Sequence, residues 1–146
     1  MKRGDPGYWK WKGNTGKPKS LKNPKILMDA AREYFEWCDD NPLLRKDFIR
    51  SGEMAGTIID IPAMRPYTWM GLEMWLRDKN IIAKLDDYRA NSRDAYSEYS
   101  DTLTHIEKII IDQKFSGAAA GFFNANIIAR DLGLTEKSES TVTIEQ

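Results

Sequence analysis

Apolar residues recur at every third or fourth position between Asn23 and Asn41, the spacing that places side chains on one face of an α-helix. That face carries Leu27, Ala30, Ala31, Tyr34, Phe35 and Cys38. Asn23 can cap the start of a helix, and Pro24 suits its first turn. The dipeptide Asn41-Pro42 is expected to end it. The pattern predicts an amphipathic helix that packs on the core by one side.

Two β-prone runs follow, and turn residues separate them. The runs are Phe48-Ile49 and Thr57 to Ile61, and the turn residues include Ser51, Gly52 and Gly56. β-Branched and aromatic residues favour strands, and glycine favours the turn between them. We therefore predict a β-hairpin around residues 47–61, bounded by Pro62 and Pro66.

A pair of short helices is predicted next. Thr68 suits the N-cap of the first helix, and Asn80 suits its end. The apolar positions of the two patterns are Leu72, Trp75 and Leu76, then Ile81, Ile82, Leu85 and Tyr88. Such a pair is typical of a helix-turn-helix, which can enter the major groove of DNA. Asp86 and Asp87 in the second helix disfavour that use, because DNA carries dense negative charge, and a packing role stays open.

The longest periodic segment begins at Ser92, and Gly133 lies where its last helix would end. The apolar positions are Tyr96, Tyr99, Leu103, Ile106, Ile109, Ile110, Phe122, Phe123, Ile127 and Leu132. Six small residues, Ser116 to Gly121, interrupt the pattern. Gly117 and Gly121 are four apart and would share one face of a continuous helix. Small residues let another backbone approach closely, either from the same chain or from another subunit.

The last residues, "STVTIEQ" from Ser140 to Gln146, alternate polar and apolar side chains and predict a short strand. Taken together, the patterns predict a mainly helical α+β fold with a long central helix pair. We divide the chain into a flexible N-terminal segment (residues 1–22), a helical body with the hairpin (23–134) and a C-terminal tail (135–146).

Composition agrees with one soluble globular domain plus tails. The chain has 146 residues, of which 41% are hydrophobic and 30% are charged. The longest apolar runs are far shorter than a membrane-spanning helix requires, so we expect no membrane partner. Cys38 is the only cysteine, which excludes an internal disulfide and fits a reducing compartment.

The charge is zero overall but unevenly distributed. Residues 1–25 carry eight basic side chains against one acidic side chain, Asp5. The basic residues are Lys2, Arg3, Lys10, Lys12, Lys17, Lys19, Lys22 and Lys25. A basic segment on an acidic body suggests a polyanion such as DNA as partner. Tyr8, Trp9 and Trp11 lie among these lysines and can anchor the segment or stack on bases.

Residues that could carry catalysis are few. His105 is the only histidine, and it lies in a helical pattern without a motif around it. The stretch "GNTGKPKS" lacks the spacing of a phosphate-binding loop and has Pro18 where Ser or Thr belongs. Asp39-Asp40 and Asp86-Asp87 are adjacent pairs that point in different directions on a helix. We expect no enzyme activity, no metal and no cofactor.

Two stretches resemble a known family. "EYFEWCDDNPL" (residues 33–43) and "IIIDQKFSGAAAGFFNANIIARDLGL" (residues 109–134) resemble the small terminase subunits of headful-packaging podoviruses. The order of basic segment, helix, hairpin, "T-x-x-G-L" helix, long helix and strand is also similar. The resemblance covers most of residues 22–136.

The resemblance implies a non-enzymatic ring, most often of nine subunits. Such a ring recognises viral double-stranded DNA and recruits and regulates the large terminase subunit, an ATPase and nuclease, in the host cytoplasm but not in the mature virion. It also implies that the C-terminal strands form a barrel between subunits. The small-residue segment then becomes a subunit contact, formed by Gly117, Ala118, Ala120, Gly121, Phe122, Phe123, Ile127 and Ile128.

This chain departs from the family pattern at its end. Similar proteins often continue into a basic tail, whereas the residues after Arg130 carry four acidic side chains against Lys137 alone. The basic residues 2–25 are the natural substitute for DNA contact. Two other functions stay open: a dimeric helix-turn-helix transcriptional regulator, and an oligomeric scaffold for the large subunit that does not bind DNA.

Overall fold

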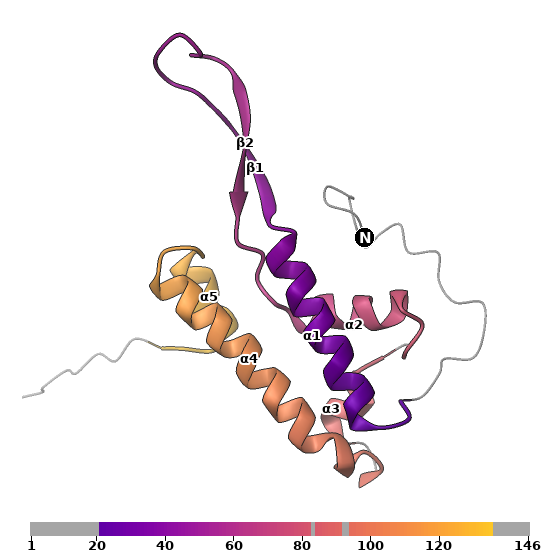
Figure 1. Cartoon of the computed structure of the whole chain (residues 1–146). Coiled ribbons are helices and arrows are strands. Elements are labelled where there is room, and N and C mark those ends of the chain that lie inside the picture. Colours follow the sequence, from indigo (N-terminus) through magenta and orange to yellow (C-terminus); the bar gives the residue numbers. More distant parts are fainter. Residues whose placement is uncertain (1–20, 83, 92–93, 136–146) are drawn as a thin grey trace, which may run out of the picture.

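The computed structural model describes residues 21–82, 84–91 and 94–135, which form a helical body and a projecting hairpin (Figure 1). The elements are α1 (Pro24–Asp40), β1 (Leu43–Phe48), β2 (Ile58–Ala63), α2 (Trp69–Asp78), α3 (Asp86–Ala90), the 3-10 turn η3 (Ser97–Tyr99), α4 (Ser100–Ala119) and α5 (Ala125–Asp131). The mainly helical α+β prediction is confirmed. Within the described residues, no helix is long and apolar enough to span a bilayer.

Helix α1 matches its prediction closely. The side chain of Asn23 accepts a hydrogen bond from the N–H of Ile26 at 3.0 Å, and Pro24 occupies the first turn. The six buried residues of α1 are the six that the sequence pattern places on one face. Asn41 ends the helix as expected.

The joint between α1 and α2 is built around one tyrosine. The Tyr34 side chain is 1% exposed, and its hydroxyl accepts a hydrogen bond from the N–H of Thr68 at 3.2 Å. Thr68 in turn caps α2, because its Oγ1 accepts the N–H of Gly71 at 2.9 Å. A Cβ atom at Gly71 would collide with the Tyr34 hydroxyl. Gly71 therefore lets the backbone of α2 come close to α1.

The two long helices, α1 and α4, pack against each other and both run towards the hairpin end of the molecule (Figure 1). Leu103, Ile106 and Ile110 form the buried face of α4. Gln113 holds the segment before α2 against this helix: its Oε1 accepts the N–H of Tyr67 at 2.9 Å, and its Nε2 donates to the carbonyl of Arg65 at 3.1 Å. The two long helices thus form the long central helix pair that the sequence predicts.

Helices α2, α4 and α5 end in the same way. A residue with positive φ follows each helix: Asn80 at 56°, Gly121 at 82° and Gly133 at 70°. The next N–H then returns to a carbonyl of the last turn, for example Phe122 to Gly117 at 2.8 Å. The prediction that Asn80 and Gly133 end helices is confirmed. The expectation that Gly117 and Gly121 share one helical face is wrong, since Gly121 lies beyond the end of α4.

The hairpin is longer than the sequence predicts. Its antiparallel register runs from Leu43 opposite Ala63 to Phe48 opposite Ile58. Pro62 lies inside β2, opposite Leu44, and not beyond it as expected. Proline is tolerated there because each strand of a two-stranded sheet has an outer edge that needs no partner.

The second helix of the predicted helix-turn-helix is short. Ile82 and Leu85 are buried, but they precede α3, which has five residues. Its start is fixed by the Glu73 side chain, whose Oε1 accepts the N–H of Leu85 at 2.9 Å. The buried positions match the prediction, but the helix begins only at Asp86, later than the sequence pattern predicts.

The contact at Gly71 gives a direct test of the α1–α2 joint. Gly71→Ala should lower the free energy of unfolding by about 1–3 kcal/mol, because the added methyl group displaces Tyr34 from a filled core. Met70→Ala is the matched control: it lies in the same turn of α2, its side chain is 82% exposed, and the change should stay within about 0.5 kcal/mol. Urea unfolding followed by circular dichroism measures both. Equal effects would contradict close packing at Gly71.

Candidate assembly and DNA-contacting surfaces

The predicted DNA-contacting residues lie mostly outside the described part of the chain. This applies to Lys2, Arg3, Lys10, Lys12, Lys17 and Lys19. Lys22 and Lys25 are described, and both are exposed next to the start of α1. The predicted strand at residues 140–146 also lies outside the described residues.

The point where the basic N-terminal segment (residues 1–22) meets the body is fixed by two tyrosines. The N–H of Leu21 donates to the Tyr88 hydroxyl at 3.0 Å, and the Tyr99 hydroxyl donates to the Leu21 carbonyl at 2.9 Å. The side chain of Leu21 is itself buried in the core. Burial raises the pKa of Tyr99, so its hydroxyl keeps the proton that it donates. Sequence reasoning missed this attachment, which joins residues 67 and 78 positions apart.

The described body is acidic and uses many of its cations internally. It contains 14 lysines and arginines against 18 aspartates and glutamates. Lys114 pairs with Asp131 at 2.7 Å and holds α5 on α4. Arg65 and Lys79 lie over the aromatic rings of Trp37 and Trp75, each at 4.8 Å from the ring centre. The described body thus has a net negative charge, in contrast to residues 1–25.

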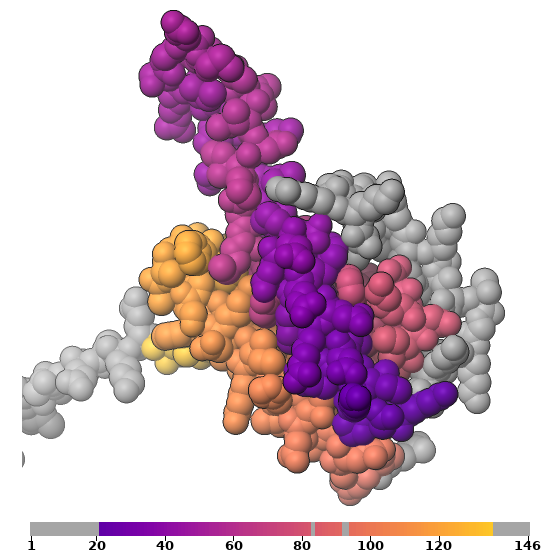
Figure 2. All heavy atoms as spheres, viewed as in Figure 1, coloured from indigo at the N-terminus to yellow at the C-terminus, as the bar shows by residue number. Residues whose placement is uncertain are grey.

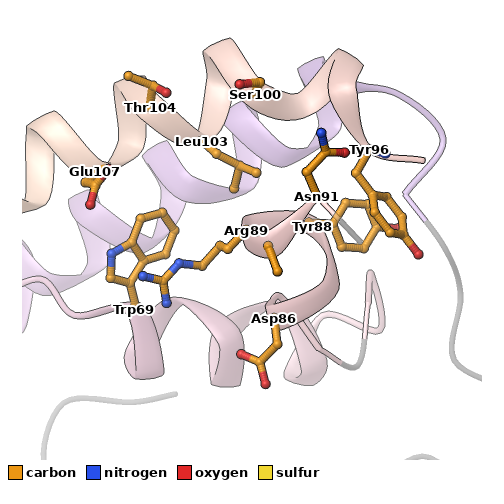
Figure 3. Close-up of a pocket in the computed structure, with 11 residues that line it drawn as sticks. Trp69, Asp86, Tyr88, Arg89, Asn91, Tyr96, Ser100, Leu103, Thr104 and Glu107 are labelled. Atoms are coloured by element: carbon orange, nitrogen blue, oxygen red, sulfur yellow. Dashed lines mark hydrogen bonds between the residues drawn. The ribbon is translucent and has the colours of Figure 1, made fainter. Parts of the chain in front are cut away.

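A cleft of about 390 Å³ lies between α3 and α4, beside the end of α2 that carries Trp69 (Figure 3). The guanidinium of Arg89 lies 4.2 Å from the centre of the Trp69 ring, and Asp86 and Glu107 also line the cleft. The two carboxylates offset the one cation. Both acidic residues at the start of α3 are exposed. The α2–α3 pair therefore presents negative charge where a groove-reading helix needs positive charge.

The one histidine and the one cysteine of the chain lie on different helices. His105 is exposed on α4, and Cys38 is buried on α1. Burial raises the pKa of the Cys38 thiol to about 11, which keeps it protonated and a poor nucleophile near neutral pH. Among the described residues, no group of three His, Cys, Asp or Glu side chains is placed to hold a metal ion.

The hairpin is the first of two surfaces with exposed apolar side chains. Cross-strand neighbours point to the same side, so Leu44, Lys46, Phe48, Ile58, Asp60 and Pro62 share one face. All six are exposed, and we call this the open face. On the opposite face Asp47, Ile61 and Ala63 are half-buried, and Leu43, Arg45 and Ile59 are exposed. Figure 2 shows the hairpin as a projection standing clear of the helical body.

The second surface surrounds the end of α4. Its exposed apolar side chains are Ile111, Phe115, Phe122, Ile127 and Leu134, which we call the α4–α5 patch. Ile111 and Phe115 lie one turn apart on the outer side of α4. Phe122 follows in the turn, and Ile127 lies on α5. This patch contains two of the predicted subunit-contact residues, Phe122 and Ile127.

The other predicted contact residues are divided between interior and surface. Gly117 is buried, and a Cβ atom there would collide with the Phe123 side chain of the same chain. Ile128 is also buried, and Ala118 is half-buried. Ala120 and Gly121 are exposed. At Gly117 the small residue thus serves a close contact within the subunit.

Comparison with known proteins identifies the family. Residues 16–140 match the family described as DNA-packaging protein gp3. The chain is 39% identical over 133 residues to the terminase small subunit of Salmonella phage P22. The aligned region covers 90% of this chain and 76% of that protein. The chain belongs to the small terminase subunit family. The resemblance carried by residues 33–43 and 109–134 is confirmed, and the small terminase subunit is a phage DNA-packaging protein.

The Gly117–Phe123 contact in this small terminase subunit can be tested separately from assembly. Gly117→Ala should lower the free energy of unfolding by about 1–3 kcal/mol, because the methyl group displaces the phenyl ring. Adding Phe123→Leu should recover part of the loss, so the two changes will not be additive. Chemical unfolding at two protein concentrations measures the free energy of unfolding of the original chain and of both variants. A loss that changes with concentration would instead place the contact between subunits.

Proposed function

We propose that this small terminase subunit assembles into a ring that binds double-stranded viral DNA and brings it to the large terminase subunit. In this role the ring recognises the packaging region of the genome and regulates the ATPase and nuclease of its partner in the host cytoplasm. The observation that carries the DNA-binding role is the separation of charge. A basic segment of residues 1–25 is attached to a body with an excess of acidic side chains.

Charge separation of this kind suits binding to the DNA backbone. Lysine and arginine contacts to phosphates release counterions, and they supply most sequence-independent affinity. An acidic body repels DNA and leaves the basic segment as the preferred point of contact. The helix-turn-helix alternative has less support, because α3 has five residues and begins with Asp86 and Asp87.

Because Leu21 has a fixed position, the phosphate contacts of the basic segments can act together in an oligomer. Tyr88 and Tyr99 hold the start of every segment at the same place on every subunit. A ring then repeats the positive charge around one rim, so many weak phosphate contacts act together at high effective concentration. Nine subunits, as in the resemblance, would place nine such segments on the DNA.

Ring formation is supported by the two unlike apolar surfaces. The open face and the α4–α5 patch both leave large apolar side chains in water, and exposed patches of this kind mark interaction sites. Two different surfaces on one subunit favour head-to-tail contacts, which close into rings when the rotation allows it. In this proposal the strand at residues 140–146 completes the ring as an inter-subunit barrel.

Removal of residues 1–20 tests the DNA-binding role. The cut leaves Leu21, its two hydrogen bonds and the Asn23 cap in place, so the body should remain folded. We expect affinity for double-stranded DNA to fall at least about ten-fold near 0.1 M salt, with a shallower salt dependence, because six cations are lost. Fluorescence anisotropy across a salt series measures both quantities.

A matched variant keeps the charge and replaces four lysines of the segment by arginine: Lys10→Arg, Lys12→Arg, Lys17→Arg and Lys19→Arg. It should bind DNA within about three-fold of the original chain, since phosphate contacts depend mainly on charge. Unchanged affinity after removal of residues 1–20 would refute the proposal that this segment is the DNA-binding element. The body would then have to supply the contacts.

A further inference from the structure

Within the described residues, the hairpin has little support beyond its base. An isolated two-stranded hairpin is at best marginally stable in water, and a third layer is usually needed. Here the strands lead away from the body, and the body holds only their base, where the Nε of Arg65 donates to the Asn41 carbonyl at 2.7 Å (Figure 1). No other described segment of the chain supplies such a layer, and another molecule can supply it.

We propose that the open face of one subunit packs on the α4–α5 patch of the next subunit in the ring. This inference rests on the proposed ring assembly and names the two surfaces that meet. It commits to a second copy of this chain as the occupant, in head-to-tail arrangement. The hairpin of one subunit lies on the end of α4 and on α5 of the next subunit.

The sizes of the surfaces fit this pairing. Large side chains bury on the order of 150–200 Å² each. The exposed fractions of Leu44, Phe48 and Ile58 then leave roughly 300 Å² of apolar surface on the open face, and those of the α4–α5 patch leave roughly 500 Å². A standard interface takes about 800 Å² from each partner, of which a little over half is apolar. The α4–α5 patch therefore provides the apolar area that one side of a stable contact needs, and the open face provides about two thirds of it.

Charge does not oppose the pairing. The open face carries one ion pair, in which the Lys46 Nζ lies 2.7 Å from the Asp60 carboxylate. These two residues are opposite each other in the register, so the face is neutral and its charges remain paired when covered. The side chains that define the α4–α5 patch carry no charge.

Pairing the open face with the α4–α5 patch covers both surfaces in every subunit. Two hairpins packed on each other would form a symmetric dimer and leave both α4–α5 patches in water. When each subunit packs its hairpin on the next subunit and receives the hairpin of the one before, both the open face and the α4–α5 patch are covered, and the chain of contacts closes into a ring when the rotation between neighbours allows it.

A pair of neighbouring substitutions tests the open face. Ile58→Thr removes an apolar contact from that face, and Ile59→Thr makes the same chemical change on the opposite face. Threonine keeps the preference for strands, so both hairpins should form. We expect Ile58→Thr to raise the concentration for half-assembly at least ten-fold, and Ile59→Thr to change it less than three-fold. Multi-angle light scattering over a dilution series measures this.

Disulfide trapping tests the pairing itself. Cys38 is 1% exposed, so it should not react. Ile58→Cys and Ala119→Cys are made in separate chains, which are mixed and oxidised under assembling conditions; Ala119 is exposed one turn after Phe115. We expect dimers in the mixture and little cross-linking in either variant alone. A mixture of Ile59→Cys with Ala119→Cys is the control and should react much less.

The outcomes separate the inference from the ring proposal. If the unaltered chain forms a large oligomer but the two threonine variants behave alike, the hairpin contact is wrong and the ring stands. If Ile58→Cys cross-links to itself, the contact is hairpin to hairpin and the inference is wrong. If the unaltered chain is monomeric at micromolar concentration, the ring proposal itself fails.

Discussion

The close approach of α2 to the Tyr34 side chain is the contact on which the rest of the body depends. Gly71 has no side chain, so the α2 backbone reaches the tyrosine, and the Tyr34 hydroxyl accepts the N–H of Thr68. This fixes the start of α2, and with it the segment that returns from the hairpin to the body. The other end of the hairpin follows directly from α1. A shift at Tyr34 would therefore move the hairpin and every contact that it makes.

The body is well packed in one region and leaves apolar surface exposed in another. Around Tyr34 and Leu21 it uses buried aromatic side chains whose hydroxyls take part in hydrogen bonds with backbone groups. At the hairpin and the end of α4 it leaves large apolar side chains in water. This division suits a subunit whose core forms alone and whose remaining apolar surface is covered by identical neighbours. The basic N-terminal segment, which joins this body at Leu21, carries the charge that we propose for DNA binding.

Much of the fold follows from local patterns, and much of the site does not. The six buried positions of α1 and the caps at Asn23 and Thr68 were predicted because periodicity and capping are local. Gly121 was misread, since a glycine that ends a helix looks like any other member of a small-residue run. The Leu21 attachment joins distant residues without a local signal. The open face could not be predicted, because only the folded chain shows which apolar side chains remain uncovered.

In the assembly that we propose, each subunit is completed by copies of itself in a closed head-to-tail ring. Native mass spectrometry of the full chain tests this most directly, because it counts subunits in each assembly. We expect one dominant oligomer with a fixed number of subunits above two, without open intermediates of varying length. A population of monomers, or of dimers that do not grow with concentration, would contradict it.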